Sequence, residues 1–532
     1  MKEIKLLDCT LRDGGYINDW EFGHSVITGT YKRLDAAGVD YIEVGFLDDR
    51  RNFDINRTIQ PNTDSYNQIF AGIEKKHAIP VAMVDYGTCD ISNIGECDTT
   101  FIDGIRVIFK KEKIEKALPF CRAIKAKGYK LFIQAISITA YSDLEMLEYI
   151  QKINEIKPYA FSIVDTYGLL DNRKLTNYFN LMNNNLNPEI KIGYHAHNNF
   201  QLAFSNSIKF LALETNRTIV VDSTVYGMGK SAGNTASELI GLHMNQRYGT
   251  NYDIDQFLEI LDTDLMAVYQ KHYWGYKYNF YISAMQNCHP NYVQFLLDKK
   301  TLSVTSINKI LSEIPSEIKL LFDQRYIENA YLRYQSQIID DSDSIMKLAE
   351  AIKDNEVLLL GPGNSLGNEE ERIKSFISDK KPIVISVNFE PSRYKCDYVF
   401  VSNAKRYSKL ADVTNIVSNA KLITTSNITL FDRQADYVLN FLSLIEQNGV
   451  ESDNALLLAI AFLQRAGVQT VFLAGFDGFT PEATDYYDSK YAFAGNTEYI
   501  VSTNETTAQG ISKLIKNIDI RFLTKSLYEP LL

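Results

Sequence analysis

A chain of 532 residues is too long for a single hydrophobic core, so two or more domains are expected. Hydrophobic residues make up 45% of the chain and charged residues 23%, an ordinary globular composition that excludes disorder on a large scale. The net charge of -11 and the pI near 5.3 disfavour a nucleic-acid-binding surface, because such a surface needs clustered Lys and Arg.

The cysteine pattern and the apolar segments indicate in which cellular compartment the protein lies. The six cysteines form no C-x-x-C pair, so the sequence indicates neither a zinc knuckle nor a disulfide framework. The first residues lack an apolar signal core, and the strongest apolar stretch, at 454–476, is interrupted by Gln464 and Arg465. We therefore expect a cytoplasmic protein without a membrane span.

Short β-branched runs alternate with amphipathic segments through the first half of the chain. This alternation predicts parallel strands joined by crossover helices. The number of runs matches the eight strands of a (β/α)8 TIM barrel, and their span fits its usual length of about 250 residues. The predicted strands are 4–8, 41–45, 80–84, 104–108, 130–135, 160–165, 191–195 and 219–223.

The residue pattern changes after the last predicted barrel strand. An aromatic-rich segment at 272–297 and a helical stretch to about 338 predict a helical extension or cap. The polar run 338–344 is the predicted linker, since nothing in it can contribute to a core. The predicted domains are therefore a barrel at 1–285, a cap with linker at 286–345, and a further domain at 346–532.

The last domain again alternates strands and helices. Its strand-like runs lie at 357–365, 382–389, 398–403, 421–427, 435–441 and 468–479. An open, doubly wound, Rossmann-like α/β sheet is the expected architecture.

The string LLDCTLRDGGY stands where the first barrel strand should end. Polar residues at that end of a barrel strand lie at the mouth where these folds carry their chemistry. Asp13 is a candidate metal ligand and Arg12 a candidate partner for an oxyanion. Taken alone, however, Arg-Asp-Gly is more often a solvated turn.

Two further strings occupy the same end of the barrel. In GYHAHNN, spacing by two residues along a strand puts His195 and His197 on one face, where both imidazoles can bind one ion. A packed or hydrogen-bonded pair is the alternative. In VYGMGKSAGNTASE, the glycines permit a close backbone approach to a ligand, and Asn234 offers an amide oxygen.

Together these strings resemble the metal-dependent barrel superfamily of 4-hydroxy-2-oxovalerate aldolases, 2-isopropylmalate and homocitrate synthases, and hydroxymethylglutaryl-CoA lyase. IEVGF with Glu43 and VDTYG with Asp165 and Thr166 add to the match, which covers about residues 1–285. The resemblance implies an enzyme and, by analogy, a homodimer.

The resemblance also implies a ligand set and a chemistry. Asp13, His195 and His197, with Asn234 as a fourth contributor, would hold Mn2+ or Mg2+, with Zn2+ or Co2+ as alternatives. The cation and Arg12 would neutralise the charge on a 2-oxo oxygen as an enolate forms. A substrate carboxylate would be bound by Thr166 and by Arg12. Glu43 would orient a metal-bound water or Arg12, or would be a buried structural carboxylate.

One position departs from the pattern. Where the hydroxy-oxovalerate aldolases carry a catalytic histidine, this sequence has Tyr16. With an ordinary pKa near 10, tyrosine is a poor base but a reasonable proton donor. The general base is then either a metal-bound water or a group from the cap.

The leading hypothesis is an aldolase that joins or splits pyruvate, or a related 2-oxo acid, and an aldehyde. The aromatic cap is similar to that of barrel proteins attributed to surface-polysaccharide synthesis, which implies a sugar aldehyde, although simple packing also explains the aromatics. An acyl-CoA-dependent condensing enzyme like 2-isopropylmalate synthase is one alternative. The other is a glycan-pathway transferase that acts through the C-terminal domain.

The C-terminal domain has its own candidate site. In GPGNSLGNEEER, the residues Gly361, Gly363 and Asn364 would lie between a strand and a helix, where phosphates bind. Asp477 follows another apolar run. These strings resemble sialyltransferase-like and motility-accessory glycosyltransferase domains, which implies nucleotide or nucleotide-sugar binding. A noncatalytic scaffold is the alternative.

Overall fold

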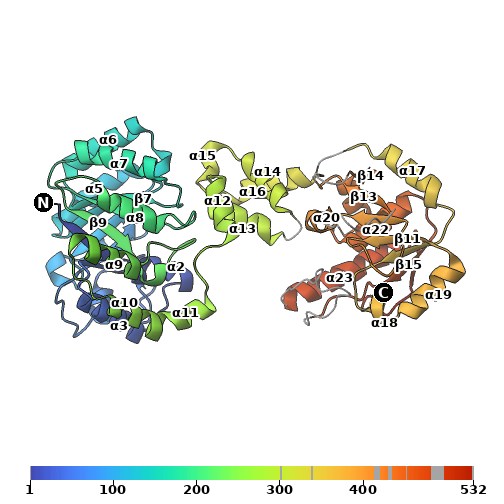
Figure 1. Ribbon diagram of the computed structural model, residues 1–532, viewed down its shortest axis with the longest axis horizontal. Coiled ribbons are helices and arrows are strands. Elements are labelled where there is room, and N and C mark those ends of the chain that lie inside the picture. Colours follow the sequence, from blue (N-terminus) through green and yellow to red (C-terminus); the bar gives the residue numbers. More distant parts are fainter. Residues whose placement is uncertain are drawn as a thin grey trace. The chain divides into compact units, whose positions relative to one another are not determined.

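The computed structural model describes residues 2–299, 302–336, 339–411, 420–428, 430, 434–450, 452–480 and 497–529. The chain forms two compact units, Met1–Pro290 with Lys319–Leu321, and Asn291–Ile318 with Phe322–Leu532. In Figure 1 the first unit is coloured mainly blue to green, and the second yellow to red. None of the described helices is both long and apolar enough to cross a membrane.

The first unit is a closed barrel of eight parallel strands, as the sequence predicts. Closure is shown by the pairing of β1 with both β9 and β2, and a two-residue strand β3 adds to β2 at the rim. The strands are β1 (Ile4–Asp8), β2 (Tyr41–Leu47), β3 (Ile59–Gln60), β4 (Ile79–Asp85), β5 (Gly104–Ile108), β6 (Lys130–Ala135), β7 (Ala160–Asp165), β8 (Lys191–Ala196) and β9 (Ile219–Ser223).

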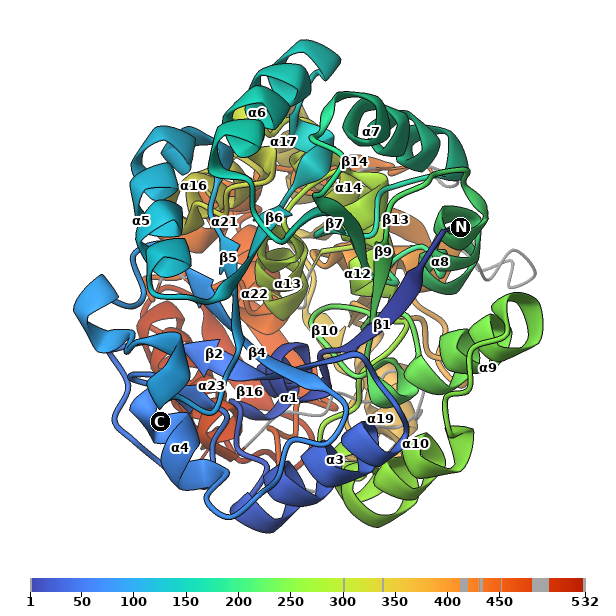
Figure 2. The same ribbon diagram turned by 90° about the vertical axis from the view of Figure 1, so that its left-hand side faces the viewer.

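Helices surround these strands in Figure 2. After two short helical turns, α1 (Thr10–Asp13) and α2 (Gly15–Asn18), they are α3 (His24–Ala36), α4 (Asp64–Ile69), α5 (Ile114–Ala126), α6 (Asp143–Ile156), α7 (Asn172–Asn185), α8 (Ala203–Ala212), α9 (Ser237–Tyr248) and α10 (Ile254–Ile260). The helix α6 begins with a complete capping box between Ser142 and Glu145.

The barrel interior is layered. An apolar layer that includes Leu7, Tyr41, Phe132 and Val220 packs as a cluster separate from the core between strands and helices. Because side chains on one face of a strand recur every second residue, the next inward layer toward the carboxyl ends contains a different set. That set is polar, and its buried members include Glu43, Arg106, Gln134, His195 and Asp222. The apolar layer is thus a floor beneath a polar site.

A helical region follows the barrel. Its helices are α11 (Met266–Lys271), α12 (Tyr278–Met285), α13 (Pro290–Asp298), α14 (Val304–Ser312), α15 (Ser316–Lys319) and α16 (Gln324–Gln335). Of these, α11 and α12 lie in the first unit, whereas α14, α16 and nearly all of α13 lie in the second. The domain limits at 285 and 345 stay predictions.

The second unit contains a seven-stranded parallel sheet in the order β14-β13-β12-β11-β10-β15-β16. Its strands are β10 (Val357–Leu360), β11 (Ile383–Val387), β12 (Tyr398–Val401), β13 (Lys421–Thr425), β14 (Tyr437–Leu439), β15 (Thr470–Ala474) and β16 (Asp519–Phe522). Its helices are α17 (Ser342–Ile352), α18 (Ser365–Asn368), α19 (Glu370–Lys380), α20 (Ala404–Ala411), α21 (Phe441–Gln447), α22 (Ala455–Arg465) and α23 (Thr497–Leu514).

Helices cover both faces of this sheet. Leu359 packs on one face with residues of α17 and α22, and the adjacent Leu360 packs on the other with residues of α19 and α20. This arrangement is the doubly wound architecture that the sequence predicts.

The predicted linker, 338–344, includes the first three residues of α17. Ile338 lies outside the described residues, but Asp341 is buried and accepts two hydrogen bonds from the Arg465 guanidinium on α22. Asp341 also accepts a hydrogen bond from the backbone N–H of Asn440. This end of the segment is therefore fastened to the second unit, because the Asp341 carboxylate pairs with the partly buried Arg465 guanidinium.

Candidate active site

Three predicted ligands converge at the carboxyl ends of the barrel strands. One ligand atom each from Asp13, His195 and His197 lies within 4.8 Å of the other two, and all three residues are buried. Asp13 ends the short helix α1 that follows β1, His195 lies in β8, and His197 comes just after β8. The two imidazole centroids are 5.1 Å apart and the rings are nearly perpendicular.

The protonation of these groups suits cation binding. The Arg12 guanidinium, and then the two imidazoles, hold the pKa of Asp13 well below its usual range, although burial alone would raise it. Burial lowers the pKa of His197 to about 3, so its imidazole is neutral near pH 7. The Nδ1 atom of His197 is 3.2 Å from the carbonyl oxygen of Lys230, which leaves Nε2 for a ligand.

Asn234 provides the test of whether a cation fits. Its Nδ2 atom donates to Asp13 Oδ1 over 3.1 Å, while its Oδ1 atom is buried with no hydrogen-bond partner in the described part of the chain. A buried acceptor left unpaired is costly unless something else binds it. One carboxylate, two imidazoles and an amide oxygen form a donor set that suits a divalent cation.

The loop after β9 is shaped to the site. A side chain at Gly229 would collide with the Asp13 carboxylate and with the Asn234 amide. The backbone N–H of Lys230 donates to Asp13 Oδ1 over 2.9 Å. The glycine-rich string is thus explained by a close approach of this loop to the candidate ligands.

Arg12 and Glu43 form a buried pair next to Asp13. Arg12 Nε donates to Glu43 Oε2 over 2.6 Å, and Arg12 Nη1 donates to Asp13 Oδ2. The second oxygen of Glu43 has no partner among the described residues. Arg12 is therefore fixed at the edge of the cluster.

The remaining predicted residues surround this centre. Tyr16 is 40% exposed and its ring packs on Trp20. Desolvation of its hydroxyl raises the pKa of Tyr16 to about 12, against the opposing charge of Arg12. Thr166 Oγ1 accepts a hydrogen bond from the backbone N–H of Ser137, so its own hydroxyl hydrogen can still be donated.

Asp165 has a structural role in the loop after β7. Its carboxylate accepts hydrogen bonds from the backbone N–H groups of Leu169 and Leu170. Burial raises the pKa of Asp165 to about 6. These contacts shape the turn that carries Thr166.

Buried residues that no sequence motif indicated hold the candidate ligands in place. Asp222 Oδ2 lies 3.0 Å from His195 Nδ1 and also accepts a hydrogen bond from Arg106. Because Asp222 is ionised, with its pKa lowered mainly by Arg106 against the effect of burial, His195 donates through Nδ1 and presents Nε2 to Asp13. Arg106 also donates to Glu43 and to Gln134. The sequence signal for Arg106 and for Asp222 was a charged residue in the middle of an otherwise apolar strand.

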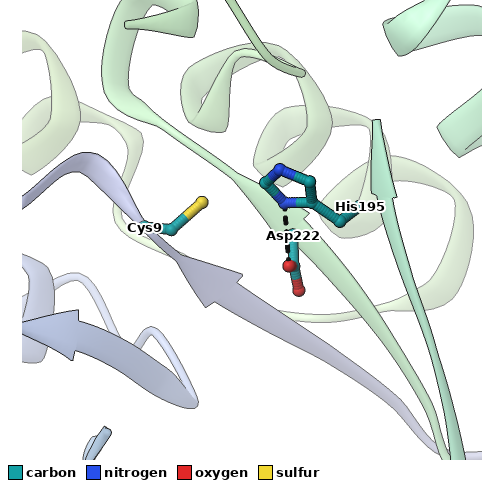
Figure 3. A group of neighbouring side chains, drawn as sticks. All are labelled: Cys9, His195 and Asp222. Atoms are coloured by element: carbon teal, nitrogen blue, oxygen red, sulfur yellow. Dashed lines mark hydrogen bonds and ion pairs between the residues drawn. The ribbon is translucent and has the colours of Figure 1, made fainter. Parts of the chain in front are cut away.

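Figure 3 draws a second group of potential ligands, Cys9, His195 and Asp222. It shares His195 with the first group, and the dashed line marks the hydrogen bond that already joins His195 to Asp222. Cys9 Sγ lies 3.2 Å from the carbonyl oxygen of Ser223, and burial raises the pKa of the thiol well above its usual range. We therefore interpret this group as support for His195.

The fold and the site define a class of protein: a (β/α)8 barrel whose mouth holds a carboxylate, two imidazoles and an amide oxygen in position for one divalent cation. Residues 3–263 match the family model described as HMGL-like, so this part of the chain is an HMGL-like domain, as the sequence motifs predict. The sialyltransferase-like resemblance of the second unit stays a prediction.

Two relatives and one solved structure are similar to about half of this chain. Oxaloacetate decarboxylase from Mycobacterium tuberculosis is 20% identical over 269 residues, which cover 50% of this chain and 77% of that protein. A 4-hydroxy-2-oxovalerate aldolase from Stutzerimonas stutzeri is 24% identical over 264 residues, or 49% of this chain and 74% of that protein. The crystal structure of hydroxymethylglutaryl-CoA lyase from Pseudomonas aeruginosa is 18% identical in sequence, with a TM-score of 0.42. The match covers 50% of this chain and 93% of that chain.

Proposed function

We propose that the barrel is a divalent-metal-dependent aldolase. It makes or cleaves a carbon–carbon bond between the enolate of pyruvate, or of a related 2-oxo acid, and an aldehyde. The observation that carries the proposal is the convergence of Asp13, His195 and His197 within 4.8 Å, beside the unpaired oxygen of Asn234. The names of two relatives add support, because oxaloacetate decarboxylation and 4-hydroxy-2-oxovalerate cleavage both leave the enolate of pyruvate.

The four ligands would hold Mn2+ or Mg2+. When bound, such a cation withdraws electron density from the 2-oxo oxygen and so stabilises the enolate. Arg12 contributes a second positive charge to the same region, and its bonds to Glu43 and Asp13 fix its orientation before substrate arrives. Fixed charge of this kind costs no reorganisation when the enolate forms. Thr166 would bind the substrate carboxylate through its hydroxyl hydrogen.

Tyr16 and His289 would divide the proton transfers. With a pKa of about 12, Tyr16 stays protonated at neutral pH and can donate its hydroxyl hydrogen, which suits a hydrogen bond to the aldehyde-derived oxygen. His289 comes from the segment between α12 and α13, and its ring lies edge-on to Tyr167, the neighbour of Thr166. Burial, followed by the charges of Lys230 and Lys110, lowers the pKa of His289 to about 4. The imidazole is therefore neutral at pH 7 and can act as a weak base.

The first part of the cap supports a sugar aldehyde as the partner. Trp274 is buried and donates through Nε1 to the carbonyl oxygen of Tyr226, in the loop after β9. Tyr281 is 43% exposed and packs edge-on against Phe200, three residues beyond His197. The exposed ring of Tyr281, held beside the ligand loop in this way, provides an apolar face for a sugar and a hydroxyl that can bond to it.

Pyruvate release from a panel of 4-hydroxy-2-oxo acids tests the proposal. The panel varies the aldehyde portion from acetaldehyde to sugar aldehydes, and a coupled lactate dehydrogenase assay reports pyruvate. Protein stripped of metal should be inactive, and Mn2+ or Mg2+ should restore activity. His197→Ala should lower kcat/KM about a hundredfold or more, because the enolate loses its main charge stabilisation.

His77→Ala is the matched control, since His77 is an exposed histidine outside the site and its loss should leave kcat/KM unchanged. If no member of the panel gives pyruvate, while acetyl-CoA and a 2-oxo acid together release free thiol, the aldolase proposal is wrong. That result would favour an acyl-CoA-dependent condensing enzyme.

A further inference from the structure

A cavity of about 620 Å³ lies within the second unit, at the carboxyl ends of its parallel strands. Residues just past five strands line it: Gly363 after β10, Asn388 after β11, Ser402 after β12, Asn427 after β13 and Asp477 after β15. This volume is in the range of small-molecule and cofactor sites.

The cavity also lies at the point where the sheet changes direction. From β10 the chain adds β11 to β14 on one side, and then returns to place β15 on the other side of β10. In open α/β sheets, ligands bind in the crevice at such a switch point. The topology and the cavity are independent observations that agree.

The floor of the cavity is built by two loops that touch. Gly361 and Gly363 donate their backbone N–H groups to the carbonyl oxygens of Ala474 and Gly475, each over 2.8 Å. Asp477 accepts hydrogen bonds from the backbone N–H and the hydroxyl of Ser365. A side chain at Gly361 would collide with Gly475 and Phe476. Packing between the two loops therefore explains why glycine occupies position 361 and aspartate position 477. Of the four predicted nucleotide-binding residues, Gly363 and Asp477 line the cavity.

Positive charge gathers along one side. Lys405 and Arg406 line the cavity from the first turn of α20, which contains no acidic residue. The partial positive charge of the helix N-terminus adds to the charge of these two side chains, so the first turn of α20 presents positive potential to the cavity. The start of α22, at Asn454 and Ala455, also lines the cavity. The side chains of Asn403 and Asn454 already accept from the backbone N–H groups of Lys405, Arg406 and Leu456, so these turns attract an anion through side-chain charge and the helix dipoles.

The helical region contributes two further residues. Lys299, just after α13, adds a third cation, and Gln335, at the end of α16, adds an amide. Gln335 is only 8% exposed, and its Oε1 atom has no hydrogen-bond partner within the described ranges. A ligand in the cavity can donate a hydrogen bond to a buried amide oxygen that is left unpaired at the cavity wall. Phe441 and Tyr528, both buried, add ring surfaces.

We propose that this cavity binds an organic phosphate, a phosphate ester that carries a ring with hydrogen-bond donors. The phosphate lies at the first turns of α20 and α22, with Lys405 and Arg406. The ring portion lies toward Gln335, whose amide oxygen accepts a hydrogen bond from it. Nucleotides and sugar phosphates share this chemistry. The site belongs to the second unit alone and does not depend on the function proposed for the barrel.

Calorimetric titration of the full-length protein, with a chelator present to exclude metal binding at the barrel, tests this proposal. The probes are inorganic phosphate, ADP, UDP, CMP and glucose 1-phosphate, together with adenosine, uridine, cytidine and glucose. We expect at least one phosphate ester to bind more tightly than both inorganic phosphate and its unphosphorylated counterpart. A preference for nucleotides or for glucose 1-phosphate identifies the source of the ring.

Variants locate the binding. The double variant Lys405→Gln/Arg406→Gln should weaken the preferred ester about tenfold or more, because two charge-assisted contacts are lost. Gln335→Leu should weaken the ester but not inorganic phosphate. Lys516→Gln, an exposed lysine outside the cavity, should bind like the wild type. Unchanged thermal unfolding of each variant shows that it is folded.

Three results would overturn the proposal. One is that no phosphate ester binds at millimolar concentrations. Another is that the esters bind no more tightly than inorganic phosphate. The third is that the double variant, still folded, binds the preferred ester as tightly as the wild type.

Discussion

Asp222 sets the orientation of His195, and its replacement should weaken metal binding. An ionised carboxylate bonded to Nδ1 fixes the tautomer and raises the basicity of the imidazole. Asp222→Asn should lower the affinity for Mn2+ about 10- to 100-fold, the usual cost of losing such a partner. Isothermal titration of the stripped protein with Mn2+ measures the change.

Cys9→Ser is the matched control at this position, because Cys9 belongs to the second group of potential ligands but is assigned only a supporting role. Its Mn2+ affinity should stay close to that of the wild type. If Cys9→Ser weakens binding as much as Asp222→Asn, the metal binds in the group of Figure 3 instead.

Metal binding should strengthen as the pH rises from acidic to neutral. Burial would lower the pKa of His195, but hydrogen bonds to Asp13 and Asp222 raise it above its ordinary value of 6.5. A proton on Nε2 excludes the metal, so affinity should rise about tenfold per pH unit until the pKa of His195 is passed. His197, with a pKa of about 3, adds nothing to this slope. Mn2+ titrations across the neutral range would contradict the prediction if the affinity were independent of pH.

At the scale of elements, the start of α17 depends on one ion pair. Asp341 and Arg465 join α17 to α22, and the carboxylate also bonds to the backbone of Asn440. Asp341→Asn should lower the free energy of unfolding of the second unit by about 1–3 kcal/mol, because a partly buried guanidinium loses its acceptors. Denaturant unfolding, followed by circular dichroism, measures this change.

The contribution of the Asp341–Arg465 pair to the stability of the second unit depends on pH. Arg465 and the Asn440 N–H lower the pKa of Asp341 in the folded protein, although burial opposes them. The stabilisation is therefore present above the unfolded pKa of Asp and is lost as the pH falls through the folded value. Asp343→Asn is the control, since its pair with Lys347 is exposed and screened by solvent, so its loss should change the stability much less. Equal effects of the two substitutions would contradict the prediction.

The strands could be predicted because each is a short, buried run between polar turns. Five of the eight barrel strands begin and end where the sequence predicts, among them Ile4–Asp8 and Ile219–Ser223. The last strand of the second sheet, Asp519–Phe522, was missed because only Ile520 is buried and charged residues flank it. The division of the cap helices between the units was also out of reach, since it depends on packing between segments far apart in the chain.

At the scale of the whole molecule, the site could be predicted where the chain places polar residues beyond strand ends. Asp13, His195, His197 and Asn234 all belong to strings of that kind. The polar layer of Arg106, Gln134 and Asp222 has no such string, because each is a single residue in an apolar strand. Only barrel closure brings these residues together. The cations of the second cavity were missed for the same reason, since they come from separate elements.

The central claim is that the barrel binds one catalytic cation between Asp13, His195, His197 and Asn234. The most direct measurement is a titration of the stripped protein with Mn2+ in which bound metal and pyruvate release are recorded on the same samples. We predict that one ion binds per chain, that activity rises in proportion to the bound ion, and that His197→Ala loses both. Activity without bound metal, or full metal binding by His197→Ala, would contradict the account.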